Sequence, residues 1–265
     1  AFGGGALEEN INGTANTAIG QSALSSNTNG LDNTACGRSA LASNTTGTHN
    51  TAVGWNAADG NVTGSYNVAI GSIALRAVDP GNYNVAVGHS ALYSNTNNSS
   101  NNVAIGAFAL ESSVAASPNT AVGFRAMDAV TSGSFNTSLG RNALGAVSTQ
   151  SGNTAVGDDA GNNVSTTNCT SLGYLAYPAG NYTNAMALGY NAHPDASNTV
   201  HIGNTSVQSI KGQVGFSTYS DARYKKNIAE DVGGLDFILK LRPVTYNVAA
   251  HQLAAHSQED MRRDS

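Results

Sequence analysis

The residue types that most often carry chemistry are scattered along this sequence. Among its six histidines, only His251 and His256 lie close together, and their spacing in a polar stretch is not typical of a metal site. Asp158 and Asp159 are adjacent, and because neighbouring side chains of a strand point in opposite directions, we expect no acid–base pair there. No metal and no cofactor are therefore expected in this chain, and no catalytic residue is expected in residues 1–203.

The composition argues against several classes of protein. Only 11% of the 265 residues are charged and 6% are aromatic, whereas 30 are glycine. A thick core of large apolar side chains is not expected from such a chain, and its many Gly, Asn and Ser residues favour tight turns. The net charge of −5 and the lack of a basic stripe argue against nucleic-acid binding. No run approaches the ~18 apolar residues that membrane insertion by a helix requires.

A repeat of about 17 residues organises the first 203 residues. The repeat is anchored by these glycines: Gly3, Gly20, Gly37, Gly54, Gly71, Gly88, Gly106, Gly123, Gly140, Gly157, Gly173, Gly189 and Gly203. An apolar residue precedes each glycine, and an alanine follows three positions later in twelve of the thirteen units. Asparagine stands four positions before the glycine in nine units. We expect an all-β parallel β-roll or β-solenoid of about thirteen coils, with asparagines laddering between coils.

Side-chain directions within a unit require two buried surfaces. Neighbouring strand residues point to opposite faces, so Ala69 and Ile70 cannot both fill the interior of a coil. The same argument predicts that Ala74 and Leu75 point in opposite directions. One surface fills the coil, and the other forms an apolar stripe along the rod, larger than soluble monomers usually expose. We therefore expect identical chains to cover this stripe around a shared axis.

The two cysteines, Cys36 and Cys169, lie eight coils apart. At about 4.8 Å per coil they cannot reach each other within one chain. Two free thiols are expected.

The Ala-[Ile/Val]-Gly-x-x-Ala core of each unit, as in Ala69–Ala74, resembles the head-domain repeats of trimeric autotransporter adhesins. Repeats of that family form a left-handed parallel β-roll. The resemblance covers residues 1–203 and implies a homotrimeric shaft. It is not complete, because a 17-residue unit is longer than the usual unit of that family.

The character of the chain changes after residue 204. Residues 204–219 lack the repeat and are expected to form an extended neck. The next segment, residues 221–265, contains 14 of the 29 charged residues. Within it Leu235, Ile238, Leu239 and Leu241 have helical spacing, and Pro243 ends the pattern. A short, partly helical C-terminal segment is predicted.

Two ordered signatures lie in this segment: Ser-Asp-x-Arg-x-Lys-x-Asn-Ile from Ser220, and Leu-x-x-Ile-Leu-x-Leu-Arg-Pro-Val-x-Tyr from Leu235. Together they resemble the start of the intramolecular-chaperone peptidase domain found at the C-terminus of endosialidase tail spikes and many phage fibres. The resemblance implies that a Ser/Lys pair makes one autoproteolytic cut, which releases the chaperone once the trimer has folded. We expect residues 220–265 to be the N-terminal part of this domain, incomplete in this chain.

The matching positions assign the roles within that domain. Ser220 takes the position of the nucleophile and Lys225 that of the base, which burial must keep neutral so that it can accept the hydroxyl proton. Asp221 and Arg223 match motif positions to which we assign structural roles.

The function expected from these features is that of an extracellular, homotrimeric fibre, in a phage-like tail or on a bacterial surface, that meets a receptor or a glycan. Aromatic residues directly after the repeat glycines, such as Trp55 and Phe124, would either contact glycans or pack under loops. One alternative is a tail spike that degrades polysaccharide, although no unit carries an insertion that would build a cleft. Another is an ice-binding solenoid, although Val68, Val85 and Val103 interrupt its row of threonines.

Overall fold

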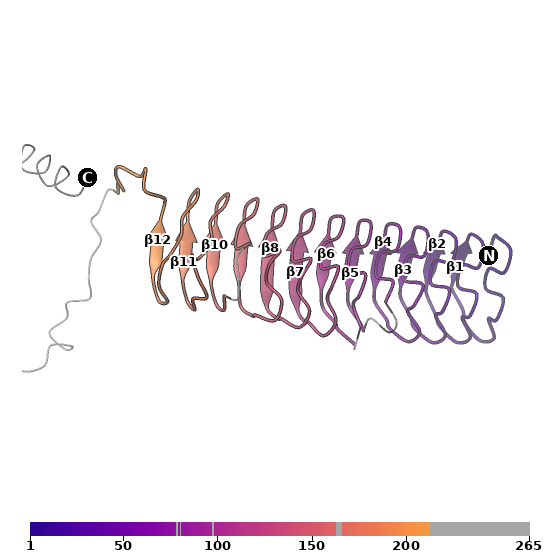
Figure 1. The fold of residues 1–265 in the computed structure, drawn as a ribbon. Coiled ribbons are helices and arrows are strands. Elements are labelled where there is room, and N and C mark those ends of the chain that lie inside the picture. Colours follow the sequence, from indigo (N-terminus) through magenta and orange to yellow (C-terminus); the bar gives the residue numbers. More distant parts are fainter. Residues whose placement is uncertain (78, 80, 97, 163–165, 213–265) are drawn as a thin grey trace, which may run out of the picture. The chain divides into compact units, whose positions relative to one another are not determined.

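The computed structural model describes residues 1–77, 79, 81–96, 98–162 and 166–212. It divides into two units, Ala1–Ile210 and Lys211–Ser265, and only the first two residues of the second are described. The first unit is a stack of coils, each of which contributes one short strand to a single sheet (Figure 1). The described residues contain no helix.

Twelve strands make up this sheet in the described part of the chain, in chain order. They are β1 (Thr17–Ile19), β2 (Thr34–Cys36), β3 (Thr51–Val53), β4 (Val68–Ile70), β5 (Val85–Val87), β6 (Val103–Ile105), β7 (Asn119–Val122), β8 (Asn136–Leu139), β9 (Thr154–Val156), β10 (Thr170–Leu172), β11 (Met186–Leu188) and β12 (Val200–Ile202).

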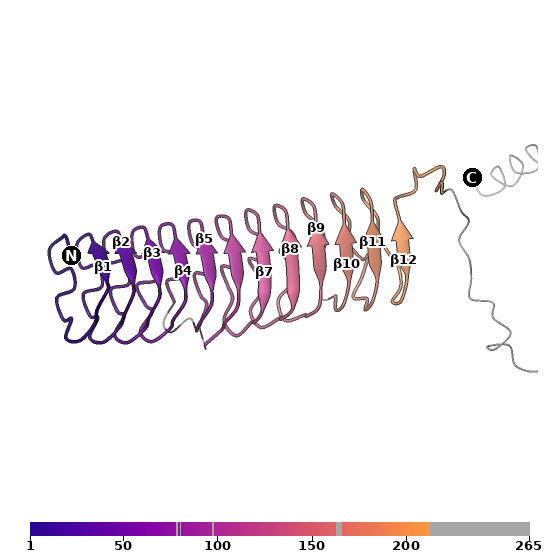
Figure 2. The same ribbon diagram turned by 180° about the vertical axis from the view of Figure 1, so that it is seen from behind.

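Each strand lies parallel to the next in the sheet (Figure 2), and equivalent residues of successive repeats are aligned. Ala69 of β4, for example, is aligned with Ala52 of β3 and Ala86 of β5. The predicted all-β parallel β-solenoid is confirmed. The number of strands differs from the thirteen units of the sequence, because the unit at Gly3 contributes only an isolated bridge between Phe2 and Ile19.

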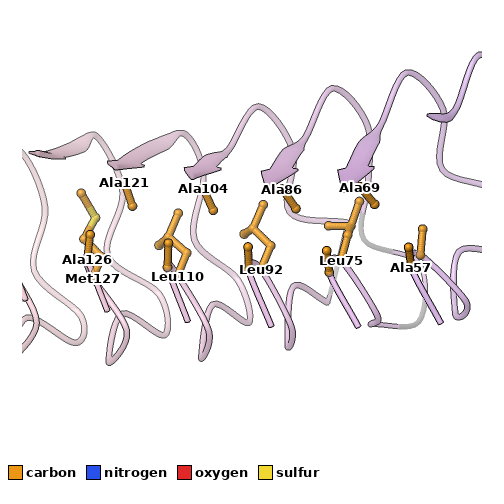
Figure 3. Packing of buried hydrophobic residues seen from close by; sticks show 14 of the residues in the cluster. Ala57, Ala69, Leu75, Ala86, Leu92, Ala104, Leu110, Ala121, Ala126 and Met127 are labelled. Carbon is orange, nitrogen blue, oxygen red and sulfur yellow. The ribbon is translucent and has the colours of Figure 1, made fainter. Parts of the chain in front are cut away.

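The core is thin and built mainly from alanine and leucine. Strand alanines such as Ala69 and Ala86 point toward Leu75 and Leu92 on the opposite wall of the coil (Figure 3). These side chains have no exposed surface. Small residues on the strand wall let the two walls approach, so that one larger side chain, a leucine in most coils, fills the space between them.

The expectation that Ala74 and Leu75 point in opposite directions is wrong, because both are fully buried. Leu75 has a φ of +50°, which lies in the left-handed region, and the alternation of an extended strand does not apply there. The turn that follows each glycine therefore brings two consecutive side chains into the core. The same conformation recurs at these equivalent positions: Leu24, Leu41, Ala58, Leu92, Leu110, Met127 and Leu144.

The repeat glycine is required by two independent features of the backbone. Gly71 has a φ of +135°, and a Cβ atom placed on it would lie 2.5 Å from the carbonyl oxygen of Gly88 in the next coil. Both the conformation and the close approach exclude other residues. Equivalent glycines from Gly3 to Gly157 meet the next coil in the same way.

The expected asparagine ladder is present on the inside of the coils. The backbone N–H of Asn67 donates to Asn50 Oδ1 at 2.9 Å, and Asn67 Oδ1 accepts from the N–H of Asn84 at 2.9 Å. Asn67 Nδ2 donates to the carbonyl oxygen of Gly81 at 2.8 Å. Each buried asparagine thus satisfies backbone groups that would otherwise be unpaired between coils.

Candidate functional site

The sequence-predicted catalytic pair, Ser220 and Lys225, lies outside the described residues, and so does the helical pattern from Leu235 to Leu241. The structure therefore leaves their roles as predictions. The described residues offer surfaces rather than an enclosed active site, and these surfaces follow the columns that the repeat creates along the rod.

The most extensive of these surfaces is the apolar stripe, formed by the residue before each repeat glycine. Its members are Phe2, Ile19, Cys36, Val53, Ile70, Val87, Ile105, Val122, Leu139, Val156, Leu172, Leu188 and Ile202. Ile70 keeps 41% of its surface exposed and Leu139 keeps 49%. The predicted outward stripe is confirmed, and it runs along the whole sheet.

In the described residues, the face of the sheet that carries the stripe lacks acidic side chains and those of lysine and arginine. Among the twelve strands of the described chain, none contains Asp, Glu, Lys or Arg. The second outward position of each strand holds Thr, Val or Met, as at Thr51, Val68 and Met186. A sheet face that stays in water usually carries polar and charged residues at such positions. Threonine occupies seven of these twelve second positions, so the continuous apolar surface is the row of residues directly before the repeat glycines.

Four aromatic side chains lie beside the stripe, among the varied residues that directly follow the repeat glycines. Trp55, Phe124, Tyr174 and Tyr190 are each about half exposed. Tyr174 and Tyr190 stack on each other, with ring centroids 5.6 Å apart. These rings retain exposed surface, so packing under loops does not fully cover them.

A second aromatic row, which the sequence analysis missed, lies at the opposite end of each coil. His49, Tyr66 and Tyr83 stack with centroid separations of 4.8 and 5.0 Å, and His49 Nε2 lies 3.6 Å from Asp32 Oδ2. Each of the three rings directly precedes a ladder asparagine. Their 17-residue spacing in the sequence was the signal that could have revealed the row.

The adjacent carboxylates of Asp158 and Asp159 converge instead of pointing apart. Arg141 Nη2 lies 2.9 Å from Asp158 Oδ2 and 3.3 Å from Asp159 Oδ2. Asp159 has a φ of +53°, so the alternation expected for a strand fails here as it does at Leu75. The hydrogen bond that Arg141 donates to Asp158, together with the negative charge of that carboxylate, raises the pKa of the Arg141 guanidinium. The cluster is an exposed ion-pair bridge between two coils.

Both cysteines are free thiols, as the sequence predicts. Cys36 belongs to the apolar stripe, whereas Cys169 is buried at the ladder position that asparagine occupies in earlier coils. Burial raises the pKa of the Cys169 thiol. Its Sγ accepts a hydrogen bond from the N–H of Ala185 at 3.4 Å, in the place of an asparagine oxygen.

Within the described residues, no three His, Cys, Asp or Glu side chains gather in an arrangement that would hold a metal ion. The described residues also include no helix with the length and apolarity needed to cross a membrane.

Comparison with known families gives one match. Residues 220–262 match the family described as the chaperone of endosialidase. This match supports the resemblance that the signatures from Ser220 and Leu235 indicate. No curated protein and no solved structure matches the chain significantly. The likeness of residues 1–203 to adhesin head repeats stays a prediction.

Proposed function

We propose that the chain holds the shaft, neck and chaperone segment of a homotrimeric, extracellular attachment fibre, of the kind that phage-like tails or bacterial surfaces carry. The exposed apolar stripe carries this proposal. Thirteen stacked residues, uninterrupted by charge, form a self-complementary surface that identical chains can share about one axis. The chaperone match at residues 220–262 supports three copies, because members of that family assist trimer folding.

The trimer can be tested by sedimentation of the whole chain at micromolar concentration. The wild type is expected to sediment as a trimer, and Ile70→Asp is expected to prevent assembly, because three carboxylates would converge in a dry seam. Thr46→Asp is the matched control, since Thr46 is exposed on a loop away from the strands. A folded wild-type monomer would refute the proposal, as would equal effects of the two substitutions.

We further propose that Ser220 and Lys225 make a single autoproteolytic cut that separates the chaperone from the shaft. A serine hydroxyl is a weak nucleophile and needs a neighbouring base, and a lysine serves as one only when burial keeps it neutral. Because both residues lie within the family match, the proposal requires no further catalytic group in the shaft.

The cut can be tested in a chain that carries the whole chaperone domain. Denaturing electrophoresis of the wild type is expected to show a fragment that ends beside Ser220. Ser220→Ala and Lys225→Arg are each expected to leave one long chain that still forms trimers. Ser220→Ala removes the nucleophile, and Lys225→Arg removes the base, because a guanidinium stays protonated at neutral pH. Lys226→Arg is the matched control and should still be cut. Normal cutting of Ser220→Ala would remove this serine from the mechanism.

A further inference from the structure

An open depression of about 460 Å³ lies on the outside of the shaft, over four successive coils. Its charged and aromatic lining comes from Asp59, Arg76 and Tyr93, which occupy the same position in consecutive repeats, five residues after the glycine. Arg76 and Tyr93 directly follow Leu75 and Leu92, so they belong to the wall that faces the strands across the core (Figure 3). The depression is therefore on a different wall from the apolar stripe.

The three side chains form a connected polar array. Arg76 Nε lies 3.4 Å from Asp59 Oδ2, and Arg76 Nη1 donates to the Tyr93 hydroxyl at 3.2 Å. The guanidinium carbon also lies 5.9 Å from the centre of the Tyr93 ring. These contacts hold a carboxylate, a guanidinium and a phenol at fixed positions along the rod before any ligand arrives.

Small residues keep the floor of the depression open. Gly60 and Ala77 directly follow Asp59 and Arg76 in their repeats and line the same space. A Cβ atom on Gly60 would lie 2.6 Å from the carbonyl oxygen of Arg76, so a larger residue does not fit there. The volume is within the ~300–1,000 Å³ range typical of small-molecule sites.

A second depression, of about 230 Å³, repeats this chemistry further along the shaft. It is lined by Arg125, Asp128, Asn142, Gly145, Ala146 and Asn162. Asp128 holds the same repeat position as Asp59, four coils later, which corresponds to about 19 Å at ~4.8 Å per coil. A Cβ atom on Gly145 would lie 3.1 Å from Asn162 Oδ1 and 3.4 Å from Asp128 Oδ1, so the glycine leaves these two oxygens accessible on either side.

The charges of the lining restrict the class of ligand. Each depression contains one arginine and one aspartate, so neither offers a net charge to an anion or a cation. Both carboxyls are partly withdrawn from water, and this burial raises the pKa of Asp59 and of Asp128. Fixed acceptors beside fixed donors suit groups that both donate and accept hydrogen bonds, and vicinal hydroxyls of a sugar are such groups.

We propose that the polar column, formed by Asp59, Arg76, Tyr93, Asp128, Gly145 and Asn162, binds a linear, uncharged saccharide that lies along the shaft. Glu111 holds the same repeat position but lines neither depression. A linear ligand is required because the two depressions lie in one column of the repeat, parallel to the stacking direction. The column would give the attachment fibre of the proposed function its ligand. The two ideas stay separable, because the column is not part of the apolar stripe.

The experiment uses the whole chain and a glycan microarray that carries uncharged linear oligomers of glucose, mannose, galactose and N-acetylglucosamine, with uronate and glucosamine oligomers as charged comparisons. Binding to an uncharged oligomer is expected, and titration calorimetry with that oligomer gives its affinity. Arg76→Ala should weaken it about ten- to hundred-fold, as expected for loss of hydrogen bonds to a charged group. Asp128→Asn should weaken binding of long oligomers more than of short ones.

Arg141→Ala is the matched control, because Arg141 also bridges aspartates between coils but lies in a different column. It should leave the affinity unchanged. If thermal unfolding shows that Arg76→Ala is misfolded, Tyr93→Phe takes its place in the test, because it keeps the ring and removes only the hydroxyl. No binding, binding to charged oligomers only, or equal losses in Arg76→Ala and Arg141→Ala would each overturn the inference. A trimer that binds no saccharide would overturn this inference and leave the proposed function intact.

Discussion

At the scale of single residues, the repeat glycine and the ladder asparagine are the two positions that the fold constrains most. The glycine allows the backbones of adjacent coils to touch, as between Gly71 and Gly88. The asparagine side chain bonds two backbone groups, as Asn67 does with the N–H of Asn84 and the carbonyl oxygen of Gly81. Both are small contributions that recur in most coils, so the stability of the shaft is approximately a sum over its repeats.

Gly71→Val is expected to destabilise the shaft strongly. The left-handed conformation alone costs about 1–3 kcal/mol for a residue with a side chain, and the clash with Gly88 adds to this. Ser72→Ala, at the neighbouring variable position, should change stability by less than about 0.5 kcal/mol. Thermal unfolding followed by circular dichroism measures both. Equal shifts of the two midpoints would contradict the role of the glycine.

The sequence predicted one asparagine ladder and missed another. The first followed from the constant spacing to the repeat glycine. The second joins Asn10, Asn27, Asn44 and Asn61, where Asn44 Nδ2 donates to Asn27 Oδ1 at 2.8 Å. These asparagines stand in the variable loop, three residues before Gly13, Gly30, Gly47 and Gly64 respectively. Only the early coils carry this pattern, so an alignment of all thirteen repeat units does not reveal it.

At the scale of the coil, side chains alternate between the core and the outer face in the strand but not in the turn. Ala69 and Ile70 lie on opposite faces as predicted, whereas Ala74 and Leu75 are both buried. Spacing alone does not reveal a left-handed leucine, because this conformation is unfavourable for residues other than glycine. The cost at Leu75 is offset by burial of its side chain and by the hydrogen bond from its N–H to the carbonyl oxygen of Ala91, at 2.9 Å.

Leu75→Ala and Ile70→Ala should therefore have different consequences. Leu75 fills the core, and its truncation is expected to cost about 2–5 kcal/mol at every protein concentration. Ile70 faces outward, so its truncation should mainly weaken assembly and make the unfolding midpoint depend more strongly on concentration. Thermal unfolding across a dilution series separates the two effects. A concentration-dependent loss for Leu75→Ala, with none for Ile70→Ala, would reverse the assignment of faces.

At the scale of the whole molecule, regular features were predictable and irregular ones were not. The solenoid, its parallel register and the stripe follow from a period and from the two faces of a strand. The polar column depends on the identities of Asp59, Arg76 and Tyr93 at a variable position, whose direction the period does not specify. The signature from Ser220 was sufficient to indicate the chaperone family, because it is a long and ordered pattern.

Cys36 offers a native reporter of assembly, because it is the one thiol in the stripe. In a trimer sealed along the stripe, N-ethylmaleimide should modify Cys36 slowly, and Ile70→Asp should make it react quickly. Cys169 is the internal control, since it is buried and its raised pKa keeps the thiol protonated at neutral pH. Mass spectrometry of the modified chain measures both rates. Rapid modification of Cys36 in the assembled wild type would place the seam elsewhere.

Because the strands keep a constant register, the number of repeat units sets the length of the shaft. The interval from Gly88 to Gly106 contains one extra residue, yet Val87 of β5 still aligns with Ile105 of β6, so the loop absorbs the insertion. Because the junctions from Gly3 to Gly157 bring each repeat glycine against the next in the same way, duplication or loss of a whole unit in this part of the gene would create no new kind of contact. The length of such a shaft can therefore change during evolution in steps of about 4.8 Å, one for each repeat unit gained or lost.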